Sequence, residues 1–210
     1  METVEGRARP FLSGIILAAG VSSRMGRPKQ LLPLRGRPLL QHVLDAVADS
    51  CLDEIIIVLG HAADEIRGAL QLPSDRPARI VLNADHALGQ STSLRAGLLA
   101  ADPRAEAVAV VLGDQPHVTA GLINTVAAAF LSAQSPVARP VHLTADGRRT
   151  PGHPVFLSRQ TWTAVEALRG DEGARSLLAD HPEWLLEVPI AGEPPRDIDT
   201  WADYSSTPDS

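Results

Sequence analysis

Residues 15–29 read Ile-Ile-Leu-Ala-Ala-Gly-Val-Ser-Ser-Arg-Met-Gly-Arg-Pro-Lys, and this stretch decides the fold. An apolar run without in–out alternation ends at Gly20, and a small, polar, basic loop follows it. A continuous apolar run is typical of a strand buried on both faces of a parallel sheet. Glycines let backbone N–H groups approach phosphate oxygens closely. The stretch therefore predicts a buried strand and, directly after it, a site for an anionic ligand.

Lys29 is the only lysine of the chain, and the other 18 basic residues are arginines. A lysine ammonium is a compact, mobile point charge, suited to a phosphate oxygen that moves during a reaction. The alternative is that the position of this single lysine is accidental. Residues 6–44 contain seven basic residues and no Asp or Glu, although the net charge of the chain is −6. We interpret this window as a local site for a polyanion rather than as a solvated basic face.

Outward from residue 29, strand and helix patterns alternate for the first 130 residues. This alternation predicts an α/β fold, a three-layer doubly wound domain with a mostly parallel sheet and a mixed edge. Pro140 inside one strand indicates an edge or a bulge. We expect a loop from Asp197 onward and a polar tail after it. The expected strands are residues 14–19, 54–59, 78–82, 107–112, 137–143, 154–157 and 184–190, and the expected helices are residues 38–48, 64–70, 91–101, 119–131, 161–168 and 174–179.

The 210 residues are enough for one domain with a sizeable core. We expect a single domain over residues 12–204, with flexible tails at residues 1–11 and 205–210. The acidic net charge argues against broad nucleic-acid binding. No apolar run has the length of a membrane span or of a signal peptide, which favours the cytoplasm. Cys51 is the only cysteine, so no intrachain disulfide is expected.

Ligands of open parallel sheets bind beyond the carboxyl ends of the strands. Asp114 directly follows the strand at residues 107–112, within Gly-Asp-Gln-Pro. A carboxylate beside a phosphate-binding loop suits Mg²⁺, whereas a lone Gly-Asp is more often a turn or a cap. Asp199, in the sequence Asp-Ile-Asp-Thr, is a candidate second ligand, and a solvated loop is the alternative. Ser91 or Thr92 is a plausible N-cap of the helix at residues 91–101.

The basic loop fits neither of two common phosphate motifs. A Walker A loop needs Gly-Lys-Ser/Thr at the start of a helix, but Lys29 lies between Pro28 and Gln30. The dinucleotide motif Gly-x-Gly-x-x-Gly is absent as well, because Gly20 is followed by Gly26. A nicotinamide-dependent oxidoreductase is therefore disfavoured.

The order of motifs resembles the molybdenum cofactor cytidylyltransferase-like nucleotidyltransferases over nearly the whole chain, about residues 14–204. Leu-Ala-Ala-Gly-x-Ser-x-Arg-Met-Gly-x-x-Lys at residues 17–29 is similar to the signature of the wider nucleotidyltransferase class. Gly-Gln-Ser-Thr-Ser-Leu (89–94), Gly-Asp-Gln-Pro (113–116), Gly-His-Pro (152–154), Gly-Asp-Glu-Gly-Ala-Arg (170–175) and Asp-Ile-Asp-Thr (197–200) look like the later motifs of the cytidylyl branch. Guanylyl relatives usually have Leu-Ala-Gly-Gly in place of Leu-Ala-Ala-Gly, so the resemblance favours CTP over GTP.

The resemblance implies a nucleotide-diphospho-sugar-transferase-like, Rossmann-like fold and transfer of CMP from CTP to the phosphate of a small acceptor, foremost molybdopterin, with release of pyrophosphate. It implies Mg²⁺, or Mn²⁺, as the cofactor, held by Asp114 and Asp199. The catalytic residues would be Arg24, Lys29 and Asp114, and Gly152 and His153 would border the acceptor. The implied nucleotide-binding residues are Leu17, Ala18, Ala19, Gly20, Ser22, Ser23, Arg24, Lys29, Asn83, Ser91, Ser93 and Gly113.

Alternatives remain open at this point. The enzyme could be a cytidylyl- or guanylyltransferase for a sugar, polyol or organic-acid phosphate. It could also be a non-catalytic escort that binds a nucleotide or cofactor. Transient contact with a molybdenum hydroxylase would fit either the leading function or the escort, and neither a nucleic acid nor a membrane is an expected partner.

Overall fold

A computed structural model describes residues 9–207 of the chain. The strands are β1 (Phe11–Ala18), β2 (Pro33–Leu34), β3 (Arg37–Pro38), β4 (Glu54–Leu59), β5 (Ala78–Leu82), β6 (Ala105–Leu112), β7 (Val137–Leu143), β8 (Arg149–Pro151), β9 (Val155–Ser158) and β10 (Leu185–Ala191). The helices are α1 (Leu39–Ala48), α2 (Ala63–Ala69), α3 (Gln90–Leu99), α4 (Ala120–Ala133), α5 (Trp162–Ala167), α6 (Ala174–Asp180) and α7 (Trp201–Ser205). No helix within residues 9–207 is long and apolar enough to cross a membrane.

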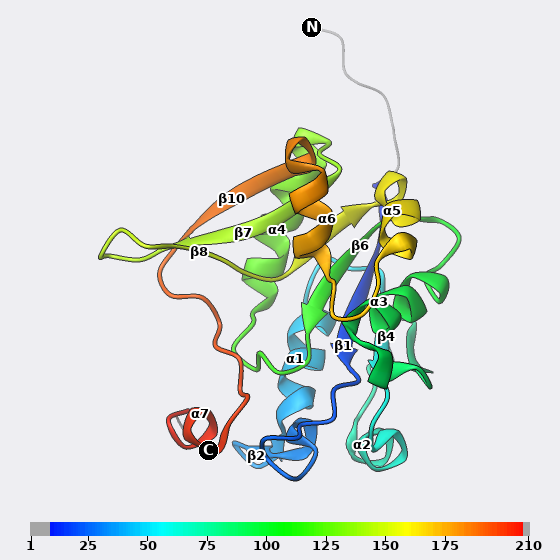
Figure 1. The fold of residues 1–210 in the computed structure, drawn as a ribbon, viewed down its shortest axis with the longest axis vertical. Helices are drawn as coiled ribbons and strands as arrows, with labels where there is room; N and C mark the ends of the chain where they lie inside the picture. The colour runs from blue at the N-terminus through cyan, green and yellow to red at the C-terminus, as the bar shows by residue number, and fades with distance from the viewer. Residues whose placement is uncertain (1–8, 208–210) are drawn as a thin grey trace, which may run out of the picture.

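One mixed sheet forms the centre of the molecule, with the strand order β10-β7-β9-β6-β1-β4-β5 and with β8 paired to β7 (Figure 1). Strands β6, β1, β4 and β5 are parallel, as their continuous apolar runs predict. Strand β9 is antiparallel to both β6 and β7, and it joins the parallel half to the β7–β10 pair. The mostly parallel, doubly wound α/β fold with a mixed edge is confirmed.

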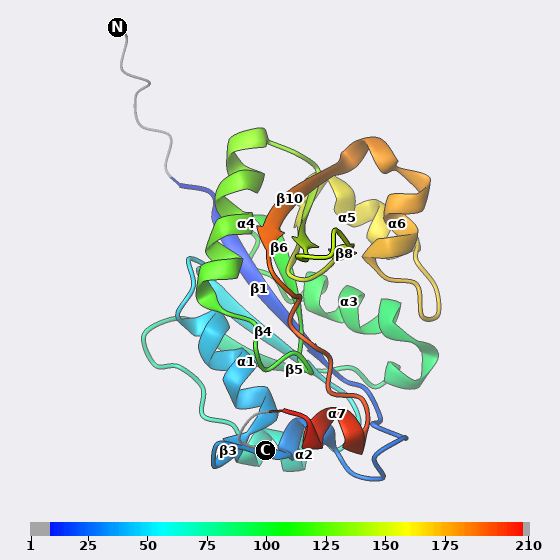
Figure 2. The same cartoon turned by 90° about the vertical axis from the view of Figure 1, so that its left-hand side faces the viewer.

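Helices cover both faces of the sheet and make three layers (Figure 2). Apolar residues of α1, α2 and α4 pack on one face and form one core with the strands. Residues of α3, α5 and α6 form a second core on the other face. Helix α1 directs a stripe of leucine and valine side chains at the sheet, and α4 begins at Thr119, whose side chain accepts from the N–H of Leu122 as its N-cap.

Two expectations for the second half of the chain are wrong: an edge position for the strand that contains Pro140, to which a bulge was the alternative, and a continuous loop after Asp197. Strand β7 is not at an edge, because β10 pairs along one side of it and β9 and β8 pair along the other. Pro140 is tolerated because it falls in the interruption between β9 and β8, where Gly152 donates to its carbonyl oxygen at 3.0 Å. The stretch after Asp197 is not all loop, since α7 begins after Thr200 with a reciprocal capping box between Thr200 and Asp203.

The expected domain limits stay a prediction. Phe11 already belongs to β1 and Ser205 to α7, so the ordered elements extend one residue beyond each predicted boundary. The expected tails at residues 1–8 and 208–210 lie outside the described residues.

Candidate active site

The loop after β1 is held open by its own polar side chains. Gln30 is buried, and its amide donates to the carbonyl oxygens of Ala18, at 3.1 Å, and Gly20, at 3.4 Å. The Ser22 hydroxyl accepts from the backbone N–H of Lys29 at 3.1 Å. These bonds fix the loop in a wide turn and bring Lys29 back beside the end of β1. Gln30 was not among the predicted site residues, and its only sequence signal is a polar residue beside the lone lysine.

Lys29 lies between two carboxylates that are far apart in the sequence. Its Nζ is 2.6 Å from Asp114 Oδ2 and 2.7 Å from Asp199 Oδ1, and its side chain is only 12% exposed. Arg24 pairs with the other oxygen of Asp199 at 3.0 Å. The predicted convergence of Arg24, Lys29, Asp114 and Asp199 is therefore present in the structure. We call these four residues the lysine–carboxylate cluster.

The backbone places each carboxylate. Gly113 directly follows β6, and a Cβ atom there would lie 2.8 Å from the Ala18 side chain, so only glycine lets β6 and β1 end this close together. The N–H of Ile198 donates to the carbonyl oxygen of Asp114 at 3.0 Å, which joins the C-terminal segment to the end of β6. Gln115 extends this junction through its amide, which donates to Asp197 at 2.7 Å.

The charges of the lysine–carboxylate cluster shift one another. Burial disfavours the Lys29 ammonium, but Asp114 and then Asp199 outweigh it, so the pKa of Lys29 is raised. Burial raises the pKa of Asp114, and Lys29 opposes that shift only in part. The hydrogen bond from Lys29 lowers the pKa of Asp199. The cluster thus combines a well-charged ammonium with two carboxylates of unlike basicity.

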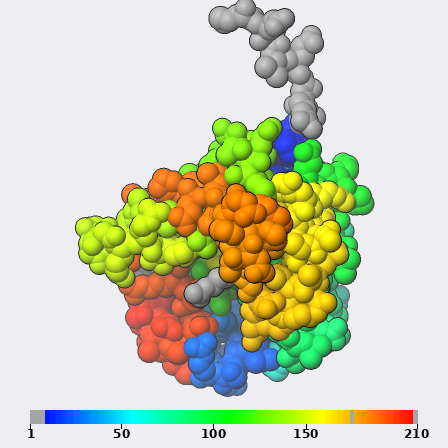
Figure 3. All heavy atoms as spheres, turned by 45° about the horizontal axis from the view of Figure 1, so that its top comes forward, coloured from blue at the N-terminus to red at the C-terminus, as the bar shows by residue number. Residues whose placement is uncertain are grey.

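A cavity of about 540 Å³ opens beside this cluster, and we call it the loop cavity. The loop after β1 forms one wall, and the segment that leads into α3 forms another. Figure 3 shows a hollow on one face of the molecule, with blue, red, orange and yellow segments of the chain around it. Of the predicted residues, Leu17, Ala18, Ala19, Gly20, Lys29, Ser93, Gly113 and Asp114 line the loop cavity.

Other predicted nucleotide-binding residues lie around the loop cavity rather than in its lining. Ser22 supports Lys29, and Ser23 is exposed in the turn. Asn83 is buried, and its amide donates to Thr92 Oγ1 at 2.8 Å and to Ser93 Oγ at 2.9 Å. Ser91 is fully buried, and within residues 9–207 its hydroxyl has no hydrogen-bond partner. Direct contact of these four with a nucleotide stays a prediction.

The expected N-cap of α3 is wrong. Gly89 is the N-cap residue, with φ at +110°, and a Cβ atom there would lie 2.1 Å from the backbone of Gly170. Ser91 donates its N–H to the carbonyl oxygen of Gly170 at 3.0 Å. The turn at residues 168–173 therefore docks on the first residues of α3 and takes the place of a capping side chain.

A second cavity, of about 850 Å³, adjoins the first, and we call it the β7 cavity. Leu17, Gln90, Leu112 and Asp171 line both cavities. Gly152 and His153, the predicted acceptor residues, line the β7 cavity. Burial lowers the pKa of His153 to about 4, with Asp114 opposing the shift and Arg139 adding to it. His153 is therefore neutral at pH 7 and within electrostatic reach of the lysine–carboxylate cluster.

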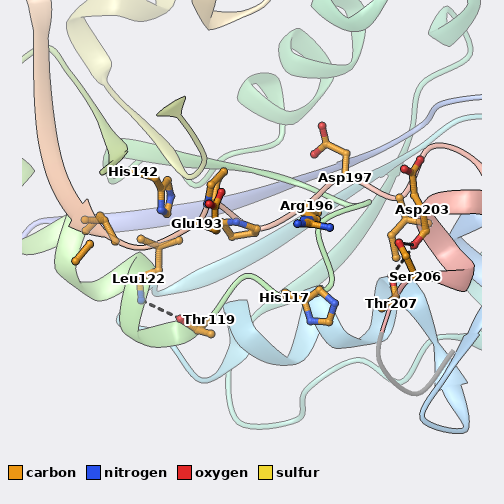
Figure 4. Close-up of a pocket in the computed structure, with 15 residues that line it drawn as sticks. His117, Thr119, Leu122, His142, Glu193, Arg196, Asp197, Asp203, Ser206 and Thr207 are labelled. Atoms are coloured by element: carbon orange, nitrogen blue, oxygen red, sulfur yellow. Dashed lines mark hydrogen bonds between the residues drawn. The ribbon is translucent and has the colours of Figure 1, made fainter. Parts of the chain in front are cut away.

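A third cavity, of about 630 Å³, lies behind the segment that carries Asp197 and Ile198. Figure 4 shows His142 and Leu122 at one end of it, Asp203 and Ser206 at the other, and Arg196 and His117 between them. Neither Lys29 nor Asp114 lines this cavity, so it is not the place where the lysine–carboxylate cluster can act on a ligand.

The lysine–carboxylate cluster suits a divalent cation in chemistry and in number of ligands. Among the described residues, Asp114 Oδ1 is buried without a hydrogen-bond partner, and both carboxylates supply hard oxygen ligands. Within residues 9–207, no three His, Cys, Asp or Glu side chains are grouped to hold a metal by themselves. Two carboxylates are the usual protein share at a Mg²⁺ site that is completed by substrate phosphates and water.

A three-layer α/β sheet with a basic loop and paired carboxylates at its carboxyl edge is the construction of a nucleotidyltransferase. Residues 14–184 match the model of the MobA-like NTP transferase domain, and the chain belongs to that family.

Two curated relatives and one solved structure extend over most of the chain. It is 34% identical to nicotine blue oxidoreductase of Paenarthrobacter nicotinovorans over 185 residues, 85% of this chain and 86% of the relative. It is 34% identical to purine catabolism protein PucB of Bacillus subtilis, over 93% of this chain and 95% of the relative. The crystal structure of Rv0371c from Mycobacterium tuberculosis has 32% identity and a TM-score of 0.79, covering 95% of this chain and 97% of that one. Rv0371c has also been solved in complex with manganese, where the TM-score is 0.74, the identity is 32% and the coverage is 93% of this chain and 96% of that one.

Proposed function

We propose that this protein transfers CMP from CTP to the phosphate of a small acceptor, foremost molybdopterin, and releases pyrophosphate. The observation that carries the proposal is the lysine–carboxylate cluster, placed at the carboxyl edge of the sheet beside the loop cavity, which adjoins the β7 cavity. One cavity would take the triphosphate and the other the acceptor. Membership of the MobA-like NTP transferase family supports the reaction class, and the Leu-Ala-Ala-Gly sequence at residues 17–20 favours CTP over GTP.

Asp114 and Asp199 would hold Mg²⁺ or Mn²⁺, and the ion would supply charge neutralisation at the substrate phosphates. The manganese complex of Rv0371c supports a divalent cation in this family. Lys29, which lines the loop cavity beside these carboxylates, would neutralise a phosphate oxygen. Arg24, whose side chain is 64% exposed, can reach outward to the departing pyrophosphate.

The chemistry needs positioning more than proton transfer. A phosphate monoester is already anionic near neutral pH, so its oxygen can attack without a general base. The neutral ring of His153 fits this scheme, because it can donate a hydrogen bond to an acceptor oxygen without taking its charge. The protein's contribution is to align the two substrates and to stabilise the growing negative charge.

The test is pyrophosphate release with Mg²⁺ and each of CTP, GTP, UTP and ATP, with and without molybdopterin. We expect release with CTP and molybdopterin together. Pyrophosphate release with another nucleotide, or with a sugar, polyol or organic-acid phosphate, would correct the proposed substrates but support the proposed type of reaction. Nucleotide binding without turnover of any acceptor would favour an escort protein, and a pull-down with a molybdenum hydroxylase would then test the hand-over.

Asp114→Ala is the matching variant. We expect turnover to fall by about a hundredfold or more, because the carboxylate nearest to Lys29 is lost. The fold should be retained, since Asp114 lies after the end of β6 and not within the core. Circular dichroism and the melting temperature check the fold. Full Mg²⁺-dependent activity in this variant would contradict the assignment.

A further inference from the structure

The walls of the β7 cavity are mostly apolar, and they carry one strong cation. The apolar lining includes Leu17, Leu94, Val110, Leu112, Val155 and Leu178, and the polar lining includes Gln90, His153, Asp171 and Ser176. Among the described residues that line it, Arg139 is the one arginine or lysine. A few polar groups in a mostly apolar pocket orient a ligand, whereas the apolar walls bury its body.

Arg139 lines this cavity from β7. Arg139 shares a face of β7 with Val137, which packs in the core beneath α3, α5 and α6. It lies directly opposite Glu187 of β10, and its Nη2 donates to Glu187 Oε1 at 2.8 Å. The second oxygen of Glu187 accepts from Arg149, also at 2.8 Å. Two guanidinium groups share one carboxylate, so this group of three carries a net charge of +1.

Arg139 has hydrogen-bonding capacity left over. Its side chain is 19% exposed, and its Nη2 donates to Glu187. A guanidinium carries five N–H donors, so the exposed part of this group can still donate to an oxygen of an anionic ligand.

The position of Arg139 relates the β7 cavity to the lysine–carboxylate cluster. His153 lines the same cavity and is within electrostatic reach of both Arg139 and Asp114. The β7 cavity shares lining residues with the loop cavity, which Asp114 lines, so an anion on Arg139 would occupy the cavity that adjoins the proposed nucleotide site. The attacking group of an acceptor has to reach that site.

We propose that Arg139 binds the phosphate of the acceptor and that the acceptor is a phosphate monoester with a ring-sized body whose faces pack on the apolar walls. This inference rests on the proposed function and names the residue and the acceptor class of the same site. A hydroxyl-rich, acyclic acceptor is disfavoured, because mostly aliphatic walls offer few partners to its hydroxyl groups. Glu187 holds the guanidinium in place, and Arg149 offsets the charge of Glu187.

The experiment is isothermal titration calorimetry on protein with Mg²⁺ and excess α,β-methylene CTP, a non-reacting CTP analogue that fills the nucleotide site. The probes are phenyl phosphate and glycerol 3-phosphate, which carry the same anion on different bodies. We expect phenyl phosphate to bind more tightly to the wild type. Arg139→Gln should weaken its binding by about ten- to hundredfold, the usual loss for a charge-assisted hydrogen bond.

Two further variants separate binding from structure. Arg149→Gln is the matched control, because Arg149 pairs with the same carboxylate but does not line the β7 cavity, and its affinity should stay near that of the wild type. Glu187→Gln removes the competing anion and should leave phenyl phosphate binding equal or tighter. If Arg139 only pairs with Glu187, both Arg139→Gln and Glu187→Gln will lower the melting temperature and neither will change affinity selectively.

The proposal is overturned if Arg139→Gln binds phenyl phosphate as the wild type does, if the wild type does not bind it, or if glycerol 3-phosphate binds more tightly. Binding does not depend on turnover, so the proposed function can fail separately. Arg139-dependent binding without any CMP transfer would refute the proposed function and keep the anion site. CMP transfer with an unchanged acceptor KM in Arg139→Gln would keep the proposed function and refute the anion site.

Discussion

Lys29 contacts two carboxylates with one atom, and this geometry depends on the shape of an ammonium. Its Nζ lies within 2.7 Å of both Asp114 and Asp199, in a space that leaves the side chain 12% exposed. A guanidinium is planar and wider, and it directs its donors in a fixed fork. We expect Lys29→Arg to lower kcat by about tenfold or more, although the charge is kept. Steady-state kinetics at saturating Mg²⁺ measure the change.

The matched control is Arg24→Lys in the same cluster. Arg24 has a 64% exposed side chain and a single contact with Asp199 at 3.0 Å, so the exchange of one cation for another should cost much less there. Equal losses in both variants, or wild-type kinetics in Lys29→Arg, would show that any cation at residue 29 is sufficient.

Protonation of His153, which lines the β7 cavity, should lower the stability of the protein at acidic pH. Its pKa is about 4 in the folded chain, because burial disfavours the charged ring, against about 6.5 in an unfolded one. Between these values the unfolded state binds more protons, so the free energy of unfolding rises with pH from about 4 to 6.5. The contribution is complete above pH 6.5 and amounts to up to about 3 kcal/mol. Urea unfolding in EDTA at several pH values should show this slope, and His153→Gln should flatten it.

An unchanged slope in His153→Gln would assign the acid sensitivity to other groups. His42, which is bonded to the carbonyl oxygen of Leu34 away from the lysine–carboxylate cluster, is the histidine to replace as a control.

Among single residues, the sequence predicts those site residues that follow a recognisable strand along the chain. Lys29 and Asp114 lie in the loops that follow strands recognisable from their apolar runs, so their proximity could be predicted from the carboxyl-edge rule. Gln30 and Arg139 could not be found in this way. Gln30 holds a turn by donating to two of its carbonyl groups. Arg139 is placed opposite Glu187 by the register between β7 and β10, and no local sequence pattern specifies that register.

Helix α7 is a short element whose function is to hold Asp199. The carboxylate of Asp203 accepts from the N–H groups of Asp199 and Thr200, and Tyr204 donates its hydroxyl to the carbonyl oxygen of Pro33. Ile198 packs with Met25 of the loop after β1 in a small apolar cluster. Figures 1 and 2 both show α7 beside the β2–β3 hairpin.

Thr200→Ala should loosen this support. It removes the side chain that caps α7, which costs about 1 kcal/mol of stability. Because α7 orients Asp199, we expect the Mg²⁺ concentration for half-maximal activity to rise by about tenfold. Ser206→Ala is the control, since Ser206 bonds only to the Asp203 carbonyl at the other end of the helix. An unchanged Mg²⁺ requirement in Thr200→Ala would mean that α7 does not position Asp199.

Among the elements, long apolar runs could be predicted and short ones could not. Strands β4, β5 and β7 have the predicted limits, because each is bounded by clear breaks in hydrophobicity. Helix α7 was missed although Thr200 and Asp203 form a capping box, since five residues give no hydrophobic period. The interior place of β7 could not be predicted, because its pairing alternates between β9 and β8 around Pro140.

Across the whole molecule, the carboxyl ends of the parallel strands carry the candidate active site, and their amino ends carry a buried carboxylate that stabilises the fold. The lysine–carboxylate cluster lies beyond the carboxyl ends, whereas Glu54 is fully buried at the amino end of β4. Glu54 accepts from Ser13 Oγ and from the N–H of Asp102, both at 2.6 Å, and it pairs with Arg79. This buried carboxylate ties β1, β4 and β5 to the segment before β6.

Glu54→Gln should therefore destabilise the protein without changing its catalysis. Loss of the buried charge leaves its partners poorly satisfied, and we expect the free energy of unfolding to fall by about 2 kcal/mol or more. The value of kcat/KM should stay within about twofold of the wild type. Urea unfolding and steady-state kinetics on the same preparation measure both. Asp114→Ala should show the opposite combination, and a variant of Glu54 that loses activity at full stability would contradict this division.

The link between Lys29 and Asp199 joins residues 170 positions apart, and that between Lys29 and Asp114 spans 85. Closing such long loops costs entropy that only an already assembled sheet can offset. We therefore expect secondary structure to return during refolding no later than the ability to bind a nucleotide. Nucleotide binding that recovers ahead of the far-UV circular dichroism signal would contradict this order.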